Sequence, residues 1–211
     1  MNVFFIDFET TGLNPYHDEI IEFAIKQKDT ENFISNVVRP NKTKVIPPKI
    51  TEITNITNDM VFSNLSITLI NACELIFTFL KENYSGEGFI YLIAHNGIPF
   101  DFVILKTLIK TYANNIDNDV KNIDLFDIYP KIRFIDSLDV SRKLVKNLNS
   151  YSQTNLCKTF NIVQENAHRA FGDVDDLNKV YNAVIKYGIN SLSLDIDLNN
   201  IKVLYDYMYS V

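Results

Sequence analysis

Two carboxylates follow a short apolar segment near the N-terminus. Asp7 and Glu9 come directly after the β-branched and aromatic run at residues 3–6. Successive side chains of a strand point to opposite faces, so these two acids share one face. Their mutual repulsion at the end of a core-like strand would be relieved by a divalent cation between them. The simpler alternative is that both side chains emerge into solvent where the strand ends.

A third acid follows a second apolar segment. Residues 89–94 are all apolar, as in a strand buried on both faces, and a loop at residues 95–100 leads to Asp101. Asp101 falls at the start of a predicted helix. An acid at that position is also a common helix cap or dipole partner.

The last group lies in the C-terminal third of the chain. His168 and Asp173 are five residues apart, and Gly172 between them marks the expected start of an amphipathic helix. Asp175 and Asp176 follow, and their placement is typical of the exposed N-terminus of a helix.

Together these groups supply four acids and one histidine, each at the end of an apolar element. Carboxylate oxygens favour Mg²⁺ or Mn²⁺, whereas zinc would need more cysteine or histidine than the chain offers. Two such ions about 4 Å apart could clamp a phosphodiester, one activating water and the other stabilising the leaving oxygen. A neutral histidine nearby could remove the proton of that water.

Three segments resemble the motifs of the DnaQ-like 3′–5′ exonucleases. These are residues 7–13, 95–101 and 168–173, in the family's order and at its usual separations. The histidine five residues before the last aspartate is typical of the DEDDh subgroup, and the motifs are closest to those of TREX-type and polymerase-proofreading members. The resemblance implies a ribonuclease H-like α/β fold, with a mixed central β-sheet flanked by helices.

The resemblance also implies residue roles. Two divalent cations, Mg²⁺ with Mn²⁺ as a substitute, would be held by Asp7, Glu9, Asp101 and Asp173, and His168 would be the general base. These five residues form the expected catalytic set.

The same resemblance implies where the 3′-terminal nucleotide is bound. The expected contacts are Thr10, Thr11, Leu13, Asn96 and Phe100. Residues 49–60 resemble the family segment that lines the terminal-base pocket, which would place Ile53 and Ile56 in its wall. Asn55 stands where glycine is common, and asparagine tolerates a positive φ nearly as well.

Apolar periodicity predicts the elements that position these groups. We expect strands over residues 3–8, 19–28, 32–38, 89–94 and 133–135, and helices over 68–83, 100–112, 137–146, 154–160, from 172 onward, and 198–208. Residues 39–65 read as a long polar connection, and 114–131 as an irregular surface insertion. We expect one exonuclease domain at residues 1–188, and a tail or helix at 189–211 that packs on it.

Composition limits the possible classes of protein. The 211 residues are 46% hydrophobic and 22% charged, which excludes collagen-like, disordered and repeat proteins. A net charge of −6 excludes nucleic-acid binding by overall charge, so phosphate contacts would be local. The candidates are Lys42, Lys44, Lys49, Lys106, Lys110, Arg142, Lys143, Lys146 and Lys158, each of which is otherwise an ordinary surface charge.

Two further features concern location. The sequence shows no signal peptide and no apolar run near the ~20 residues that span a bilayer. Cys73 and Cys157 lie in apolar stretches and are expected to be reduced and buried. We therefore expect an intracellular protein, cytoplasmic or nuclear, that is neither secreted nor membrane-bound.

The function expected from the sequence is a metal-dependent 3′–5′ exonuclease. It would hydrolyse terminal phosphodiester bonds at single-stranded or frayed 3′ ends of DNA or RNA, and a polymerase or a second copy of the chain are candidate partners. The alternative is a non-catalytic nucleic-acid-binding or adaptor domain that retains the fold. Such relatives usually lose an acid or the histidine, and this chain has all five.

Overall fold

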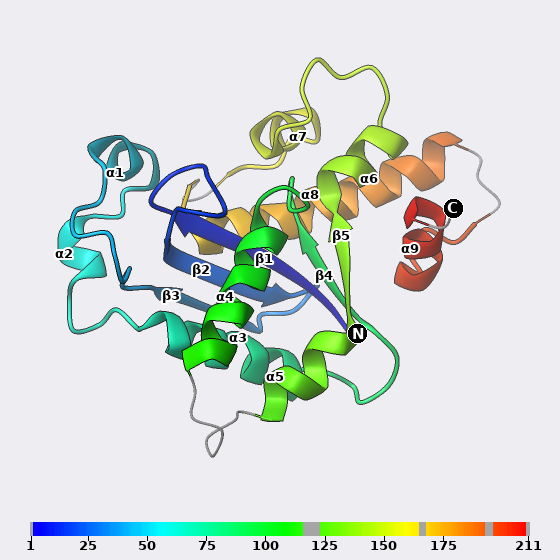
Figure 1. The fold of residues 1–211 in the computed structure, drawn as a ribbon. Coiled ribbons are helices and arrows are strands. Elements are labelled where there is room, and N and C mark those ends of the chain that lie inside the picture. The colour runs from blue at the N-terminus through cyan, green and yellow to red at the C-terminus, as the bar shows by residue number, and fades with distance from the viewer. Residues whose placement is uncertain (1, 116–122, 165–167, 193–195, 210–211) are drawn as a thin grey trace.

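A mixed five-stranded sheet forms the centre of the molecule (Figure 1). The computed structural model describes residues 2–115, 123–164, 168–192 and 196–209. The strands are β1 (Val3–Thr10), β2 (Ile20–Gln27), β3 (Phe33–Val37), β4 (Ile90–Ala94) and β5 (Ile132–Asp136), in the order β3-β2-β1-β4-β5. The β1–β2 and β2–β3 pairs are antiparallel, and the β1–β4 and β4–β5 pairs are parallel. This confirms the predicted ribonuclease H-like α/β fold.

Helices cover both faces of this sheet (Figure 1). They are α1 (Pro48–Thr54), α2 (Asn58–Val61), α3 (Leu69–Glu82), α4 (Asp101–Asn115), α5 (Ile123–Ile128), α6 (Ser137–Leu144), α7 (Gln153–Thr159), α8 (Ala170–Leu192) and α9 (Ile201–Tyr209), with a 3₁₀ turn at Tyr129–Lys131. Helices α3, α4 and α5 pack on one face, and α6 to α9 on the other. No helix within the described ranges is long and apolar enough to cross a membrane.

The alternation of side chains along β1 decides where its acids point. Phe4 and Ile6 belong to the apolar cluster beneath α3 and α4, whereas Val3 and Phe5 belong to the cluster beneath α8. Asp7 and Glu9 continue the odd-numbered series, so they lie on the α8 side of the sheet.

Two polar segments are more ordered than the sequence predicted. Residues 39–65 contain α1 and α2, and Ile46, Ile56 and Val61 bury against Ile21 to form a small third cluster. The expectation of an irregular insertion at 114–131 is wrong over its last part, since residues 123–131 are helical. Leu125 and Ile128 belong to the main core there; residues 116–122 lie outside the described part.

The start of α8 also differs from the prediction. The helix begins at Ala170, two residues before Gly172, because the buried Glu22 carboxylate accepts the N–H of Ala170 at 2.9 Å and so caps the first turn. Gly172 is buried inside that turn and does not break the chain.

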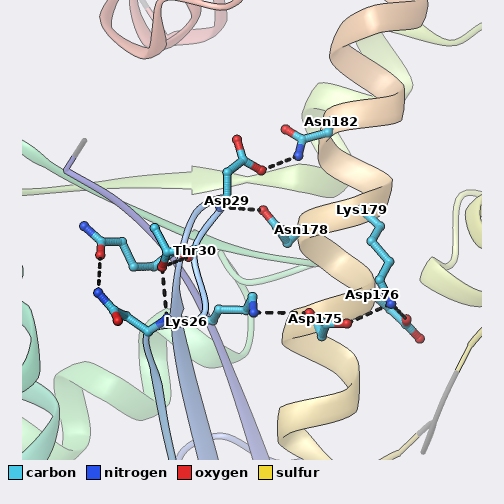
Figure 2. A network of polar contacts seen from close by, with 10 residues as sticks. Lys26, Asp29, Thr30, Asp175, Asp176, Asn178, Lys179 and Asn182 are labelled. Atoms are coloured by element: carbon cyan, nitrogen blue, oxygen red, sulfur yellow. Dashed lines mark hydrogen bonds and ion pairs between the residues drawn. The ribbon is translucent and has the colours of Figure 1, made fainter.

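Figure 2 shows that Asp175 ties α8 to the sheet, whereas Asp176 contacts Lys179 of its own helix. Asp175 is paired with Lys26 of β2 at 3.3 Å and with Lys179 at 2.7 Å, and Asp176 is only 1% exposed. Asn182 donates to Asp29 in the β2–β3 turn at 2.6 Å. The expectation that these two acids lie on an exposed helix end is therefore wrong, since both face neighbouring structure.

The C-terminal segment packs on the same body. Leu198 and Leu204 are buried in the cluster beneath α6 and α8. Helix α8 runs past residue 188 to Leu192, and the division of the chain at residue 188 stays a prediction.

Candidate active site

Three of the predicted acids meet at the end of β1. Asp7 and Glu9 lie on the α8 side of the strand, and Asp173 lies in the first turn of α8. One carboxylate oxygen from each lies within 4.8 Å of the others. An all-oxygen group of this size suits a hard divalent cation such as Mg²⁺ or Mn²⁺.

Asp101 approaches the same strand end from α4. Its side chain is 3% exposed, and its Oδ1 accepts the backbone N–H of Phe8 at 3.2 Å. With Asp7 and Glu9 it lines a cavity of about 480 Å³. The fourth acid thus faces the same space as the β1 acids, outside the three-acid group itself.

The electrostatics of this site resist full ionisation. Burial, followed by the charges of Asp101 and Glu9, raises the pKa of Asp7 well above its usual value. Burial and the neighbouring Asp173 raise the pKa of Glu9 to about 8, and burial raises that of Asp101 to about 8 and that of Asp173 to about 6. The charged forms of these four carboxyl groups are disfavoured in the metal-free site. Such a group of acids fits a site that binds a positively charged ion.

The structure brings the backbone of His168 to this cluster. Its N–H donates to Oδ2 of Asp173 at 3.1 Å, and its φ of +63° lies in the left-handed region. The side chain is exposed, on the segment that enters α8.

An ion pair that the sequence did not predict fixes this segment. Glu22 lies opposite Glu9 in the β1–β2 register and is 3% exposed. Both its oxygens accept the Nε–H of Arg169 at 3.1 Å, and it also accepts the N–H of Ala170. Glu22 therefore holds the two residues that follow His168. The sequence signal for this ion pair was Glu22, a charged residue in the middle of an apolar strand.

The expected substrate residues fall into two groups. Leu13, Asn96 and Phe100 line the cavity with the acids, and Leu13 is 88% exposed. Thr10 and Thr11 are buried where β1 ends, and their hydroxyls bind within the following loop, to the carbonyl of Gly12 at 2.5 Å and the carboxylate of Asp18 at 3.2 Å.

The two isoleucines of the base-pocket segment lie apart from that cavity. Ile53 is 43% exposed on α1, whereas Ile56 is fully buried in the third cluster. Asn55 between them has a φ of +58°, the left-handed conformation that its glycine-like position suggested. The segment thus presents Ile53 outward and is anchored by Ile56.

Comparison with known proteins gives a consistent result. The exonuclease family model RNase_T matches residues 4–181. DNA polymerase III PolC-type of Mycoplasma genitalium is 30% identical over 97% of this chain and 13% of its own length, and exonuclease DPD1 (chloroplastic/mitochondrial) of Arabidopsis thaliana is 28% identical over 86% and 55%. E. coli exonuclease I, solved with a dT13 oligonucleotide, superposes with a TM-score of 0.70 at 19% identity, over 90% of this chain and 42% of that one.

The sheet order is that of the ribonuclease H-like fold, with an acidic cluster at the end of β1. The chain belongs to the RNase T, DnaQ-like exonuclease family. It spans about an eighth of the PolC-type relatives and under half of exonuclease I.

Proposed function

We propose that this chain is a 3′–5′ exonuclease that hydrolyses terminal phosphodiester bonds of DNA or RNA and releases nucleoside 5′-monophosphates. The observation that carries the proposal is the meeting of Asp7, Glu9 and Asp173 within 4.8 Å beside a cavity that also contains Asp101. The family match supports the reaction class.

The acids fit divalent cations by donor type and by charge. Asp7, Glu9 and Asp173 would hold one ion, and Asp7 with Asp101 a second. When bound, these ions supply an activated water and stabilise charge on the leaving 3′ oxygen. The raised pKa values mean that the carboxyl groups give up protons as the cations bind.

The remaining residues act on the water and on the terminal nucleotide. His168 would accept the proton of the attacking water from its exposed position beside Asp173. Leu13 would wedge against the terminal base, and the exposed Ile53 would lie on the other side of the nucleotide, on a segment anchored by the buried Ile56. The segment at Thr10 and Thr11 would hold the sugar and phosphate.

The rest of the cavity would meet the scissile end. Asn96 and Phe100 line it together with Leu13. Single-stranded or frayed 3′ ends suit a cavity of this kind, in agreement with the dT13 oligonucleotide in the exonuclease I structure. A polymerase is a reasonable partner because the PolC-type relatives are polymerases, and a second copy of the chain is the alternative.

The test uses 5′-labelled single-stranded DNA and RNA of one sequence, with Mg²⁺, Mn²⁺ or EDTA. Wild type is compared with Asp7→Ala and His168→Ala. We expect a ladder that shortens from the 3′ end, requires metal, and is absent in both variants. A single internal cut would refute the 3′-end assignment, and binding without any cleavage would favour the non-catalytic adaptor domain.

A further inference from the structure

A buried aspartate holds the loop that carries Asn96 along the cavity. Asp136, the last residue of β5, is 2% exposed. Its Oδ1 accepts the N–H of Asn96 at 2.9 Å, and its Oδ2 accepts the N–H of Ile98 at 3.0 Å. Oδ1 also accepts the N–H of Leu138 at 2.9 Å, so one carboxylate caps α6 and fixes the loop at residues 95–100.

The sheet register explains why this residue can reach the loop. β4 and β5 are parallel, and Ala94 lies opposite Asp136, so both strands end at the same edge. Asn96 has a φ of +59°, a left-handed conformation that asparagine adopts more readily than most residues. The hydrogen bonds to Asp136 hold the backbone at this residue and at Ile98.

Helix α9 is attached to the same residue from the other side. The hydroxyl of Tyr209 accepts the N–H of Asp136 at 2.8 Å. The helix itself is fixed by the buried Leu204, by Tyr205 against Tyr91 at 5.7 Å between ring centres, and by a hydrogen bond from Lys143 to the carbonyl of Tyr207. Helix α9 lies beyond the residues matched by the exonuclease family, which end at 181.

We propose that Asp136 and Tyr209 are positioning residues for the substrate-binding loop, through which helix α9 takes part in ordering the active site. The proposal rests on the exonuclease function proposed above. Asp101 accepts the N–H of Phe8, and the nearby charge of Asp136 helps to raise its pKa. The loss of the loop contacts should therefore weaken substrate binding, and Tyr209→Phe, which keeps the charge of Asp136, should leave metal dependence unchanged.

Two substitutions separate loop positioning from helix capping. Asp136→Ser keeps a good cap for α6 but cannot bridge to Asn96 and Ile98. Tyr209→Phe keeps the ring and removes the hydroxyl. We expect KM for labelled single-stranded DNA to rise about tenfold in the first variant and about threefold in the second, as for one or two lost hydrogen bonds. In Tyr209→Phe, turnover and the half-saturating Mg²⁺ concentration should stay within about twofold, because the charge of Asp136 near Asp101 is kept.

Hydrogen exchange supplies a readout that does not need activity. Amides at residues 95–100 should exchange faster in both variants than in wild type. Tyr207→Phe is the matched control, because Tyr207 lies on the same helix and the variant keeps both its backbone carbonyl and its ring, which Lys143 contacts. Oligonucleotide affinity measured with Ca²⁺ in place of Mg²⁺ should fall in parallel with the rise in KM.

Unchanged exchange and unchanged KM in both variants, with only a lower melting temperature or a smaller active fraction, would overturn the proposal. If Asp136→Ser does not fold, Tyr209→Phe decides the question alone. A wild type that degrades neither DNA nor RNA would refute the exonuclease function, and exchange together with oligonucleotide affinity would still decide the role of the two residues.

Discussion

At the scale of single residues, the buried pair of Glu22 and Arg169 connects the sheet to the segment that carries His168. Glu22 is 3% exposed and Arg169 about a third exposed, so the interaction is only partly screened by solvent. Its removal should loosen the entry to α8 without touching the cavity lining.

A double-mutant cycle measures this connection. Glu22→Gln and Arg169→Gln should each lower the free energy of unfolding by about 1–3 kcal/mol, since each leaves a poorly paired group. The double variant should lose less than the sum, with a coupling of about 0.5–3 kcal/mol. Urea denaturation gives the values, and Glu31→Gln, at an exposed position, is the control. Strictly additive losses would show that the pair does not act as a unit.

Glu9 shows how function and stability oppose each other at one residue. Its pKa of about 8 results from burial and from Asp173, so its charged form destabilises the metal-free fold. We expect Glu9→Gln to abolish nuclease activity and to raise the melting temperature in EDTA at pH 9, with a smaller gain at pH 6. A lower melting temperature at pH 9 would contradict this electrostatic account.

At the scale of elements, the position of Asp173 depends on how α8 is held against β2. Lys26 is 4% exposed, whereas Asp175 is 31% exposed and is also paired with Lys179 (Figure 2). Loss of Asp175 would therefore leave a buried lysine unpaired, whereas loss of Lys26 would leave Asp175 paired with Lys179.

This difference predicts an asymmetry between two substitutions. Asp175→Asn leaves the buried Lys26 without a counter-charge and should cost about 3 kcal/mol or more. Lys26→Met leaves Asp175 paired with Lys179 and should cost about 1 kcal/mol. Chemical denaturation of both variants checks the order, and the reverse order would mean that Lys26 finds another partner.

The elements that the sequence predicted well are those with strong apolar patterns. The strand at residues 89–94 and the helix after residue 68 needed only their own residues to be recognised. Helices α1 and α2 were missed because few of their own side chains are buried, and their stability comes from contacts with β2.

In the candidate site too, some residues could be predicted from the sequence and others could not. Its acids could be predicted because each follows an apolar element in a familiar motif. Glu22 and Asp136 could not be assigned their contacts, because their partners lie far away in the chain and only the register of the sheet brings them together.

At the scale of the whole molecule, the buried acids make folding depend on pH and on metal. The carboxyl groups of Glu9, Asp101 and Asp173 have raised pKa values in the folded state. The folded protein therefore binds more protons than the unfolded chain between about pH 4 and pH 8. The stability that this contributes is complete below pH 4 and is lost as the pH rises through the folded-state values.

We therefore expect the melting temperature in EDTA to fall by several degrees from pH 5.5 to pH 8.5, at about 2–4 °C per kcal/mol for a domain of this size. Mg²⁺ should stabilise the protein more at the higher pH, because the carboxylates are then available to bind it. Differential scanning fluorimetry with and without Mg²⁺ checks both trends. A Mg²⁺ effect that does not grow with pH would argue against proton release from the acid cluster.

The order of the acids along the chain has a consequence for protein synthesis. Asp7 and Glu9 lie on the first strand, whereas Asp173 lies on α8, after every strand of the sheet. Domains fold as units during synthesis, so a nascent chain that has not reached α8 lacks one wall of the acid cluster. The acid cluster can therefore be completed during synthesis only after the chain has been made as far as α8.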